Sequence, residues 1–151
     1  MSAVQNRRLK RLLALLLIAT LCFIWGNSLV PREESAELSG GVLSVFAPLL
    51  ERLGLDPTDD RPVRKLAHLC EYGALGMELA ALFFLHGRKS LQQGANAAFC
   101  ALLVAVTDET IQIFSGRGSL VSDVWIDFSG ALLGIALLSA LFRGAEQKPH
   151  P

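Results

Sequence analysis

The sequence predicts an all-α membrane protein, a polytopic bundle of four transmembrane helices with one short extracytoplasmic amphipathic helix. Of its 151 residues, 52% are hydrophobic, and the mean hydropathy is +0.43, which exceeds that of ordinary soluble domains. Four apolar segments reach the roughly 18–22 residues that a tilted helix needs to cross a bilayer of about 30 Å. Backbone groups in lipid must be bonded internally, so these segments are expected to be helices. The length suits a single domain, 1–151.

Each predicted helix follows from an apolar run and its flanking charges. The first helix begins in a basic arm and continues through the apolar stretch from Leu12 to Leu29. The third has an unbroken apolar run only from Ala97 to Val106, which is too short to span a bilayer alone. Its outer half must therefore be shielded by protein. The four helices have approximate bounds 10–29, 66–86, 95–114 and 121–142.

The loop between the first two helices, 30–64, is expected to contain the amphipathic helix. Apolar residues recur in it at helical spacing, and Gly54 can end the helix. This helix would either lie on the outer leaflet or cap the bundle. Its apolar residues are Val42, Val45, Phe46, Leu49 and Leu53.

The distribution of basic residues predicts the orientation. Of the 14 Lys and Arg residues, four lie in the N-terminal arm, two at 88–89, two in the C-terminal tail and six on the other side. Cytoplasmic segments close to membrane helices are enriched in Lys and Arg. Both termini are therefore predicted in the cytoplasm, and the loop 30–64 is predicted outside.

Composition excludes several function classes. Acidic and basic residues balance at 14 each, so no overall field favours a nucleic-acid partner. The sequence contains no P-loop, no dinucleotide-binding glycine fingerprint and no zinc-binding cysteine spacing, so the identity of any cofactor is left unknown. Three cysteines lie singly in apolar segments and are expected to be small buried hydrophobes: Cys22, Cys70 and Cys100.

Polar side chains from different helices are expected at one depth, in the outer half of the bilayer. They fall in the first turns of the second and fourth helices and the last turns of the third, at about 1.5 Å per residue. Within each helix the spacing is i, i+3 or i, i+4, so each set forms one face. These faces must turn inward, because lipid does not accept charge. The residues are Arg64, Lys65, His68, Glu71, Tyr72, Asp108, Glu109, Gln112, Asp123 and Asp127.

Small residues suggest where helices approach closely. Gly130 and Gly134 form a small-xxx-small pair on the fourth helix, through which an oligomer could also form. Gly73 and Gly76 could act similarly on the second helix.

The motifs VRKLAHLCEYGALG (63–76) and TDETIQIFSGRGSLVSDVWIDFSGALLG (107–134) resemble those of VanZ-like membrane proteins. The resemblance covers nearly the whole chain and implies a small helical protein of the bacterial cytoplasmic membrane. The founding members are associated with resistance to the glycopeptide teicoplanin, which targets lipid-linked cell-wall precursors. The resemblance thus implies a fold and a site, without a reaction, and Glu78 lies outside the pattern. The pattern falls on Lys65, His68, Glu71, Tyr72, Asp108, Glu109, Gln112, Gly116, Arg117, Asp123, Asp127, Gly130 and Gly134.

Two non-catalytic functions are open for the polar residues. In the first, Arg64, Lys65 or Arg117 neutralises the carboxylates in a buried network that fixes helix register. In the second, the same cations bind the phosphate of an anionic lipid or lipid-linked cell-wall precursor in an outward-facing pocket. The pocket would be formed by the polar residues of the three helices together with Arg117.

Two further functions are an enzyme and a transporter. An enzyme acting on a lipid phosphate would use His68, Glu71, Asp108 or Glu109 in catalysis. Asp108, Glu109, Asp123 and Asp127 could hold a hard divalent cation through oxygen ligands. Ion or proton transport is less well supported, because only Glu78 and His86 continue inward.

Overall fold

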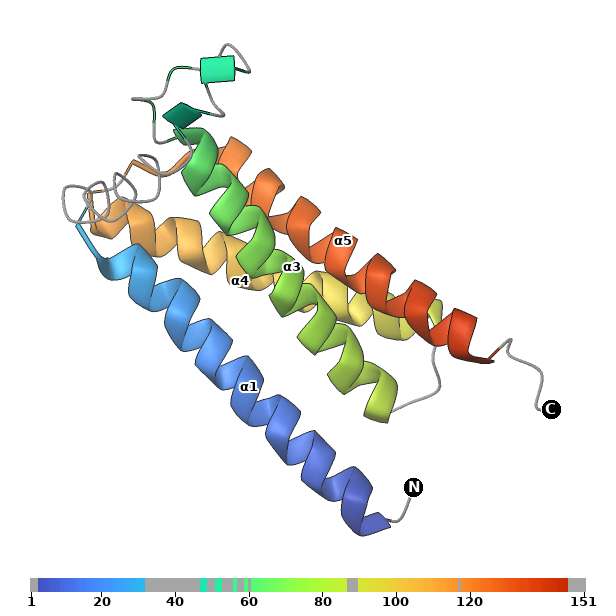
Figure 1. Cartoon of the computed structure of the whole chain (residues 1–151). Coiled ribbons are helices and arrows are strands. Elements are labelled where there is room, and N and C mark those ends of the chain that lie inside the picture. The colour runs from blue at the N-terminus through green and yellow to red at the C-terminus, as the bar shows by residue number, and fades with distance from the viewer. Residues whose placement is uncertain are drawn as a thin grey trace.

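The structure is a computed structural model that describes residues 3–31, 47–48, 51–52, 56, 59, 61–86, 90–116 and 118–146. These residues contain four long helices and no strand, and each helix is long and apolar enough to cross a membrane (Figure 1). The predicted all-α bundle with four transmembrane helices is therefore confirmed. The predicted amphipathic helix falls largely outside the described residues. The helices are α1 (Ala3–Leu29), α3 (Arg61–His86), α4 (Leu91–Phe114) and α5 (Val121–Glu146).

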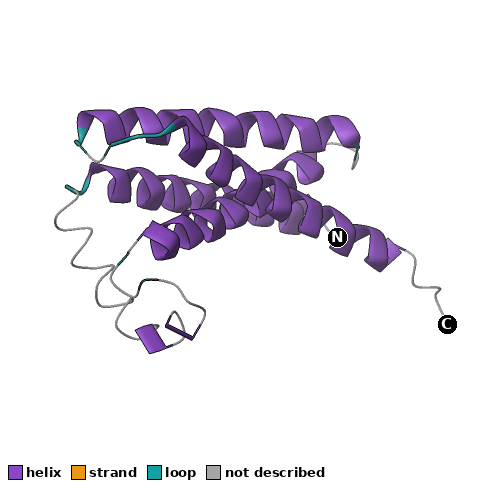
Figure 2. Ribbon diagram, turned by 90° about the horizontal axis from the view of Figure 1, so that it is seen from above, coloured by secondary structure: helices purple, strands orange, loops and turns teal. Residues whose placement is uncertain are grey.

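The helices run alternately up and down the bundle (Figures 1 and 2). The last turns of α1 and α4 meet the first turns of α3 and α5 at one end, which we call the polar end. The start of α1 and the end of α5 lie at the opposite end. An even number of spans thus places both ends of the described bundle on one side, and the identity of that side stays a prediction.

Three helices begin earlier than their apolar segments, because an α-helix continues past the hydrocarbon region for as long as its backbone can bond. At the polar end, α3 begins at Arg61, five residues before the predicted start at 66. Pro62 suits the first helical turn, where its missing N–H leaves no intrahelical bond unmade. Asp59 accepts a hydrogen bond from the Arg61 backbone N–H at 3.0 Å. Arg61, Arg64 and Lys65 are therefore fixed on a helix rather than carried on a loop.

The closest helix packing is between α3 and α5, where glycines let the two backbones touch. A Cβ added to Gly134 would meet the Gly73 carbonyl and lie 2.9 Å from its carbon. Gly130 faces the Leu69 backbone, and Gly76 faces the Ala131 backbone in the same way. The close approach expected at these glycines is thus made between two helices of the same chain, α3 and α5. An oligomer through Gly130 and Gly134 stays a prediction.

The buried face of α4 changes character along its length. Ala97, Ala101 and Ala105 recur every fourth residue and are fully buried against the other helices. The same face continues into Asp108, Glu109 and Gln112 at the polar end, where small apolar residues give way to polar ones. The polar side chains in the outer half of the third predicted helix are thus shielded by protein, as expected, since these three are at most 4% exposed, while other side chains of that half are exposed.

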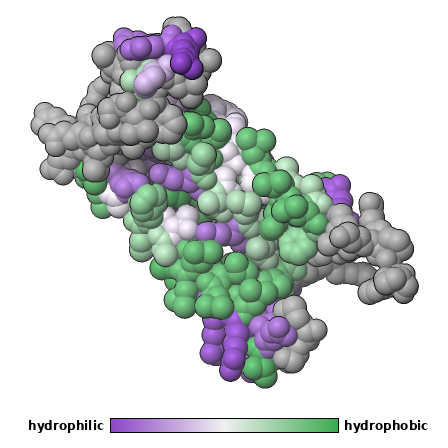
Figure 3. Space-filling model, viewed as in Figure 1, coloured by the Kyte–Doolittle hydropathy of each residue, from purple (hydrophilic) through white to green (hydrophobic). Residues whose placement is uncertain are grey.

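Large hydrophobic side chains cover the outside of the bundle, as is expected where lipid surrounds a protein. Figure 3 shows hydrophobic surface along the middle of the helices and hydrophilic surface at the start of α1. The expectation that the three cysteines are buried is wrong: Cys22 and Cys70 are exposed and Cys100 is half-buried. In a membrane bundle an apolar residue can face lipid as readily as the core, so hydrophobicity alone does not predict burial.

Candidate functional site

A network of polar side chains joins α1 to the end of α4. The Ser28 hydroxyl donates to Asp108 Oδ1 at 2.6 Å, and both residues are fully buried. Gln112 Nε2 donates to Asp108 Oδ2 and to Glu109 Oε1, each at 3.0 Å. Ser119, in the turn before α5, donates to Glu109 Oε2 at 2.6 Å. All four carboxylate oxygens of the α4 acids therefore have donors, and these donors are uncharged.

The turn between α4 and α5 brings Ser119 into this network. Gly116 and Gly118 have φ values of 72° and 76°, a left-handed backbone conformation that residues with a side chain rarely adopt. Ser115 ends α4 and donates from its hydroxyl to the Ser28 carbonyl of α1 at 2.8 Å. The sequence pattern Ser-Gly-x-Gly-Ser thus supplies the tight reversal and anchors it to α1.

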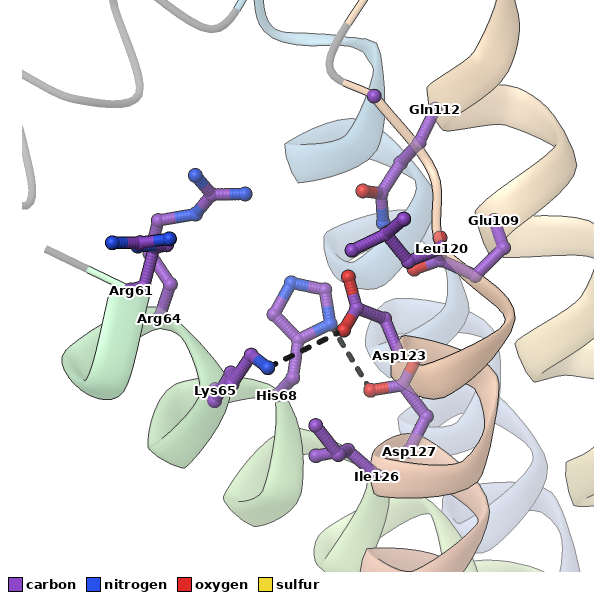
Figure 4. Close-up of a pocket in the computed structure, with 11 residues that line it drawn as sticks. Arg61, Arg64, Lys65, His68, Glu109, Gln112, Leu120, Asp123, Ile126 and Asp127 are labelled. Atoms are coloured by element: carbon purple, nitrogen blue, oxygen red, sulfur yellow. Dashed lines mark hydrogen bonds and ion pairs between the residues drawn. The ribbon is translucent and has the colours of Figure 1, made fainter.

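Two contacts between ionisable side chains join α3 to α5. His68 Nδ1 lies 3.2 Å from Asp127 Oδ1, and Asp127 is fully buried. One turn nearer the end of the bundle, Lys65 Nζ lies 3.8 Å from Asp123 Oδ1, with about half of the lysine side chain exposed. Figure 4 shows both contacts crossing from α3 to the first turns of α5. Lys65 and His68 are three residues apart on α3, and Asp123 and Asp127 are four residues apart on α5. Because α3 and α5 run in the same direction, the two contacts follow one another along the pair of helices.

A cavity of about 230 Å³ opens between these elements at the polar end. Its α3 wall carries basic groups, and its α4 and α5 walls carry carboxylates and the Gln112 amide (Figure 4). At the rim, the side-chain hydrogen bond from Arg61 holds the pKa of the exposed Asp59 carboxyl below its usual range. The cavity therefore presents opposite charges on facing walls. It is lined by Arg61, Arg64, Lys65, His68, Glu109, Gln112, Gly118, Leu120, Asp123, Ile126 and Asp127.

Behind the cavity, two buried oxygens have no hydrogen-bond partner among the described residues. One is the Tyr72 hydroxyl, which belongs to a fully buried side chain on α3. The other is Asp127 Oδ2, the carboxylate oxygen that does not contact His68. Buried polar atoms are nearly always satisfied in native proteins, so these two oxygens are available to a bound water or ligand.

Three potential metal ligands converge at the same place. One ligand atom each from His68, Asp108 and Asp127 can be chosen so that all three lie within 4.8 Å of one another. This set differs from the four carboxylates expected to hold a cation. Glu109 instead bonds Gln112 and Ser119, and Asp123 faces Lys65.

The structure brings most of the sequence-predicted site residues together. Seven of them line the cavity: Arg64, Lys65, His68, Glu109, Gln112, Asp123 and Asp127. Tyr72 and Asp108 are buried behind it, and Glu71 is half-buried on α3 without lining it. Arg117 lies outside the described residues.

Sequence reasoning missed several contributors. Ser28 is expected at the outer end of the first predicted helix, at the depth of the other polar residues, but it was not included among the candidate site residues. Arg61 precedes the apolar segment and was assigned to the loop, although one further helical turn places it on the cavity wall. Glu78, which had no assigned role, accepts a hydrogen bond from Thr20 of α1 at 2.9 Å, well below the cavity.

Comparison with known proteins adds the family. The family model described as VanZ/LLP1 matches residues 13–143, which include all of the cavity-lining residues. Comparisons with curated proteins and with solved structures give no match.

Proposed function

The chain belongs to the VanZ/LLP1 family, and we propose that its polar end binds the phosphate-bearing headgroup of a membrane lipid or lipid-linked cell-wall precursor. The observation that carries this proposal is the position of three cations, Arg61, Arg64 and Lys65, on one wall of a cavity at the end of a membrane bundle. A headgroup lies at that depth when its acyl or prenyl chains lie along the apolar helices. The predicted orientation makes this the outer leaflet.

The chemistry of the two walls suits a phosphate that carries further polar groups. A guanidinium can bind two phosphate oxygens at once, and a lysine contributes a compact charge. Lys65 is only loosely held by Asp123, at 3.8 Å, so it can turn toward a ligand without losing a short hydrogen bond. Glu109 and Asp123, on the other walls, can accept bonds from the hydroxyl or amine groups of a headgroup.

The volume of the cavity suits the headgroup of a lipid better than a whole lipid molecule. Pockets for drug-sized molecules have volumes of about 300–1,000 Å³, and this cavity is smaller. Leu120 and Ile126 supply apolar contacts on the α5 side of the cavity. A ligand with a small polar head inside and a long apolar tail outside matches these features.

Binding to two lipid classes tests the proposal. Purified protein in nanodiscs of phosphatidylcholine is titrated with phosphatidylglycerol and, separately, with a polyprenyl diphosphate. We expect the double variant Arg64→Gln, Lys65→Gln to weaken binding about tenfold or more, since a charge-assisted hydrogen bond contributes about 1.5–3 kcal/mol before screening.

Arg143→Gln is the matched control, because Arg143 is an exposed cation at the opposite end of α5. Equal losses in the two variants would show that binding follows overall charge. Retained affinity in the double variant would contradict the proposal. The lipid that binds with the higher affinity, phosphatidylglycerol or the polyprenyl diphosphate, identifies the class of lipid that supplies the headgroup.

The family resemblance connects this proposal to the cell envelope. A protein that holds a lipid-linked precursor at the outer surface would alter how a glycopeptide such as teicoplanin reaches that precursor. We expect cells expressing this chain to show a change in teicoplanin susceptibility that the Arg64→Gln, Lys65→Gln variant lacks at equal membrane abundance. An identical change with both proteins would disconnect the cavity from resistance.

A further inference from the structure

We propose that His68, Asp108 and Asp127 bind a single divalent transition-metal ion, Zn²⁺ or Mn²⁺, on the floor of the cavity. This site goes beyond headgroup binding and does not depend on it, because its three ligands are separate from the cations that would hold a phosphate. The ligands come from α3, α4 and α5, so the ion would join three of the four helices.

The geometry is close to that of a tetrahedral site. For bonds of about 2.0–2.1 Å, tetrahedral ligand atoms lie about 3.3 Å apart. His68 Nδ1 and Asp127 Oδ1 are already 3.2 Å apart. The complete set lies within 4.8 Å, so carboxylate rotations and small shifts of about 1 Å would close it around an ion. An ion would replace the His68–Asp127 contact with a bond to each partner.

Charge balance supports a dication. Asp108 and Asp127 are both fully buried, and ionised carboxylates in such positions need a compensating charge. A protonated His68, at 3.2 Å, would supply it to Asp127 alone, whereas a metal ion would supply it to both carboxylates and leave the imidazole neutral. Among the described residues, Asp108 is bonded only to Ser28 and Gln112, which are neutral donors. Lys65, the nearest lysine on the cavity wall, pairs with Asp123 rather than with either aspartate. A divalent ion with two carboxylates and a neutral imidazole has no net charge.

The unpartnered buried atoms point to the same position. Tyr72 follows His68 by four residues on α3, so the two side chains lie on the same face of the helix, and the Tyr72 side chain is fully buried. Its hydroxyl has no partner in the described part of the chain, and neither has Asp127 Oδ2. An ion between the carboxylates, with its bound water, would give both oxygens a partner.

The surroundings of Asp108 resemble an outer ligand shell. Ligating carboxylates are themselves held by hydrogen bonds, which fix their orientation toward the metal. Ser28 and Gln112 hold both oxygens of Asp108 from α1 and α4. The α1 helix, which supplies no ligand, would thus still contribute to metal affinity.

The donor set selects the kind of ion. One imidazole nitrogen with two carboxylate oxygens suits Zn²⁺ or Mn²⁺ better than Ca²⁺ or Mg²⁺, which prefer oxygen ligands alone. Three protein ligands leave a coordination position open, as in catalytic rather than structural zinc sites. That position faces the cavity, because His68 and Asp127 both line it.

Metal binding by the purified full chain tests the proposal. Chelator-treated protein in detergent, without added lipid, is titrated separately with Zn²⁺, Mn²⁺ and Mg²⁺, and bound metal is counted by mass spectrometry after gel filtration. We expect one Zn²⁺ or Mn²⁺ per chain and none of the Mg²⁺. His68→Gln and Asp127→Asn should each weaken binding at least about 100-fold, since each removes a ligand. Glu78→Gln, which neutralises another carboxylate inside the bundle, should leave binding unchanged.

A milder variant keeps the test decisive if ligand variants fail to fold. Ser28→Ala removes one hydroxyl that holds Asp108, and outer-shell changes typically cost about 10–100-fold in metal affinity. Three results would overturn the proposal: wild-type protein that binds no stoichiometric Zn²⁺ or Mn²⁺, full affinity in Ser28→Ala, or equal losses in Asp127→Asn and Glu78→Gln. Headgroup binding is measured with chelator present, so either proposal can fail without the other.

Discussion

The packing of α3 against α5 predicts that Gly134→Ala destabilises the protein, although alanine is the better helix former. In an unobstructed helix this exchange is favourable by about 1 kcal/mol. Here the new Cβ would meet the Gly73 carbonyl, with 2.9 Å to its carbon and 3.1 Å to the Met77 nitrogen. These neighbours are backbone atoms, which cannot rotate away as a side chain would.

The size of the effect follows from these distances. Carbon atoms in good contact lie about 3.5–4.0 Å apart, and the Gly73 carbonyl oxygen is closer still than its carbon, so α3 and α5 must separate by at least about 0.6–1.1 Å at this point. Overpacking of this kind costs about 1–3 kcal/mol, of which the helix preference of alanine offsets part. We expect a net loss of about 1–2 kcal/mol in the free energy of unfolding, or a factor of about 5–30 in the unfolding equilibrium constant.

The assay is unfolding of purified protein in mixed micelles with increasing sodium dodecyl sulfate, followed by tryptophan fluorescence. Gly26→Ala is the matched control, because a Cβ at this helical glycine of α1 meets nothing within 4 Å. The control should be neutral or more stable by up to about 1 kcal/mol. If Gly134→Ala were as stable as Gly26→Ala, the backbone contact between α3 and α5 would not exist as described.

Three further predictions concern individual polar contacts. Ser119→Ala removes the donor to the buried Glu109 Oε2, so the free energy of unfolding should fall by about 1–3 kcal/mol. The control Ser122→Ala, at an exposed serine, should change the free energy of unfolding by less than about 0.5 kcal/mol. Equal effects of the two variants would exclude the Ser119–Glu109 contact. Thr20→Val removes the bond between α1 and Glu78 of α3 and should cost about 0.5–1.5 kcal/mol, while Thr107→Val, whose hydroxyl bonds only its own helix, should cost less in the same titration. Arg61→Gln should raise the pKa of Asp59 in an NMR titration, because the Arg61 side chain holds that pKa low. The contribution of this pair to stability is present above the usual Asp range and is lost as pH falls through the folded-state pKa. An unchanged titration of Asp59 would contradict the contact.

Much of the fold was predictable from apolar length alone, since the bilayer imposes both helix and span. The starts of α1, α3 and α4 were not, because helical hydrogen bonding does not end where hydrophobicity does. Arg61 shows the consequence: it belongs to α3, yet the apolar pattern assigned it to a loop. The burial of the cysteines was also mispredicted, since lipid-facing and core-facing positions are both apolar.

The depth of the site was predictable, but its internal pairing was not. Counting residues from the helix ends places the polar side chains at one level, and the structure brings most of them together there. Which carboxylate faces which partner depends on the rotation of each helix, which is set by glycine contacts between α3 and α5. Asp123 and Asp127 look equivalent in sequence, yet one faces Lys65 and the other faces His68.

At the polar end, the buried polar atoms on the α1–α4 side differ in hydrogen bonding from those on the α3–α5 side. On the α1–α4 side, Ser28, Gln112 and Ser119 supply donors to every carboxylate oxygen of Asp108 and Glu109. The carboxylates of this half are fully hydrogen-bonded, but by uncharged Ser and Gln donors rather than by the cations that the first interpretation of the sequence predicts.

On the α3–α5 side the network is incomplete. Asp127 Oδ2 and the Tyr72 hydroxyl are buried without a partner among the described residues, and Lys65 is held only at 3.8 Å. A purely structural network would gain from satisfying these atoms, because an unsatisfied buried polar group costs about 1–3 kcal/mol. The fully hydrogen-bonded α1–α4 side can thus join those helices without a ligand, whereas the ligands proposed above would give the unpartnered atoms of the α3–α5 side a partner.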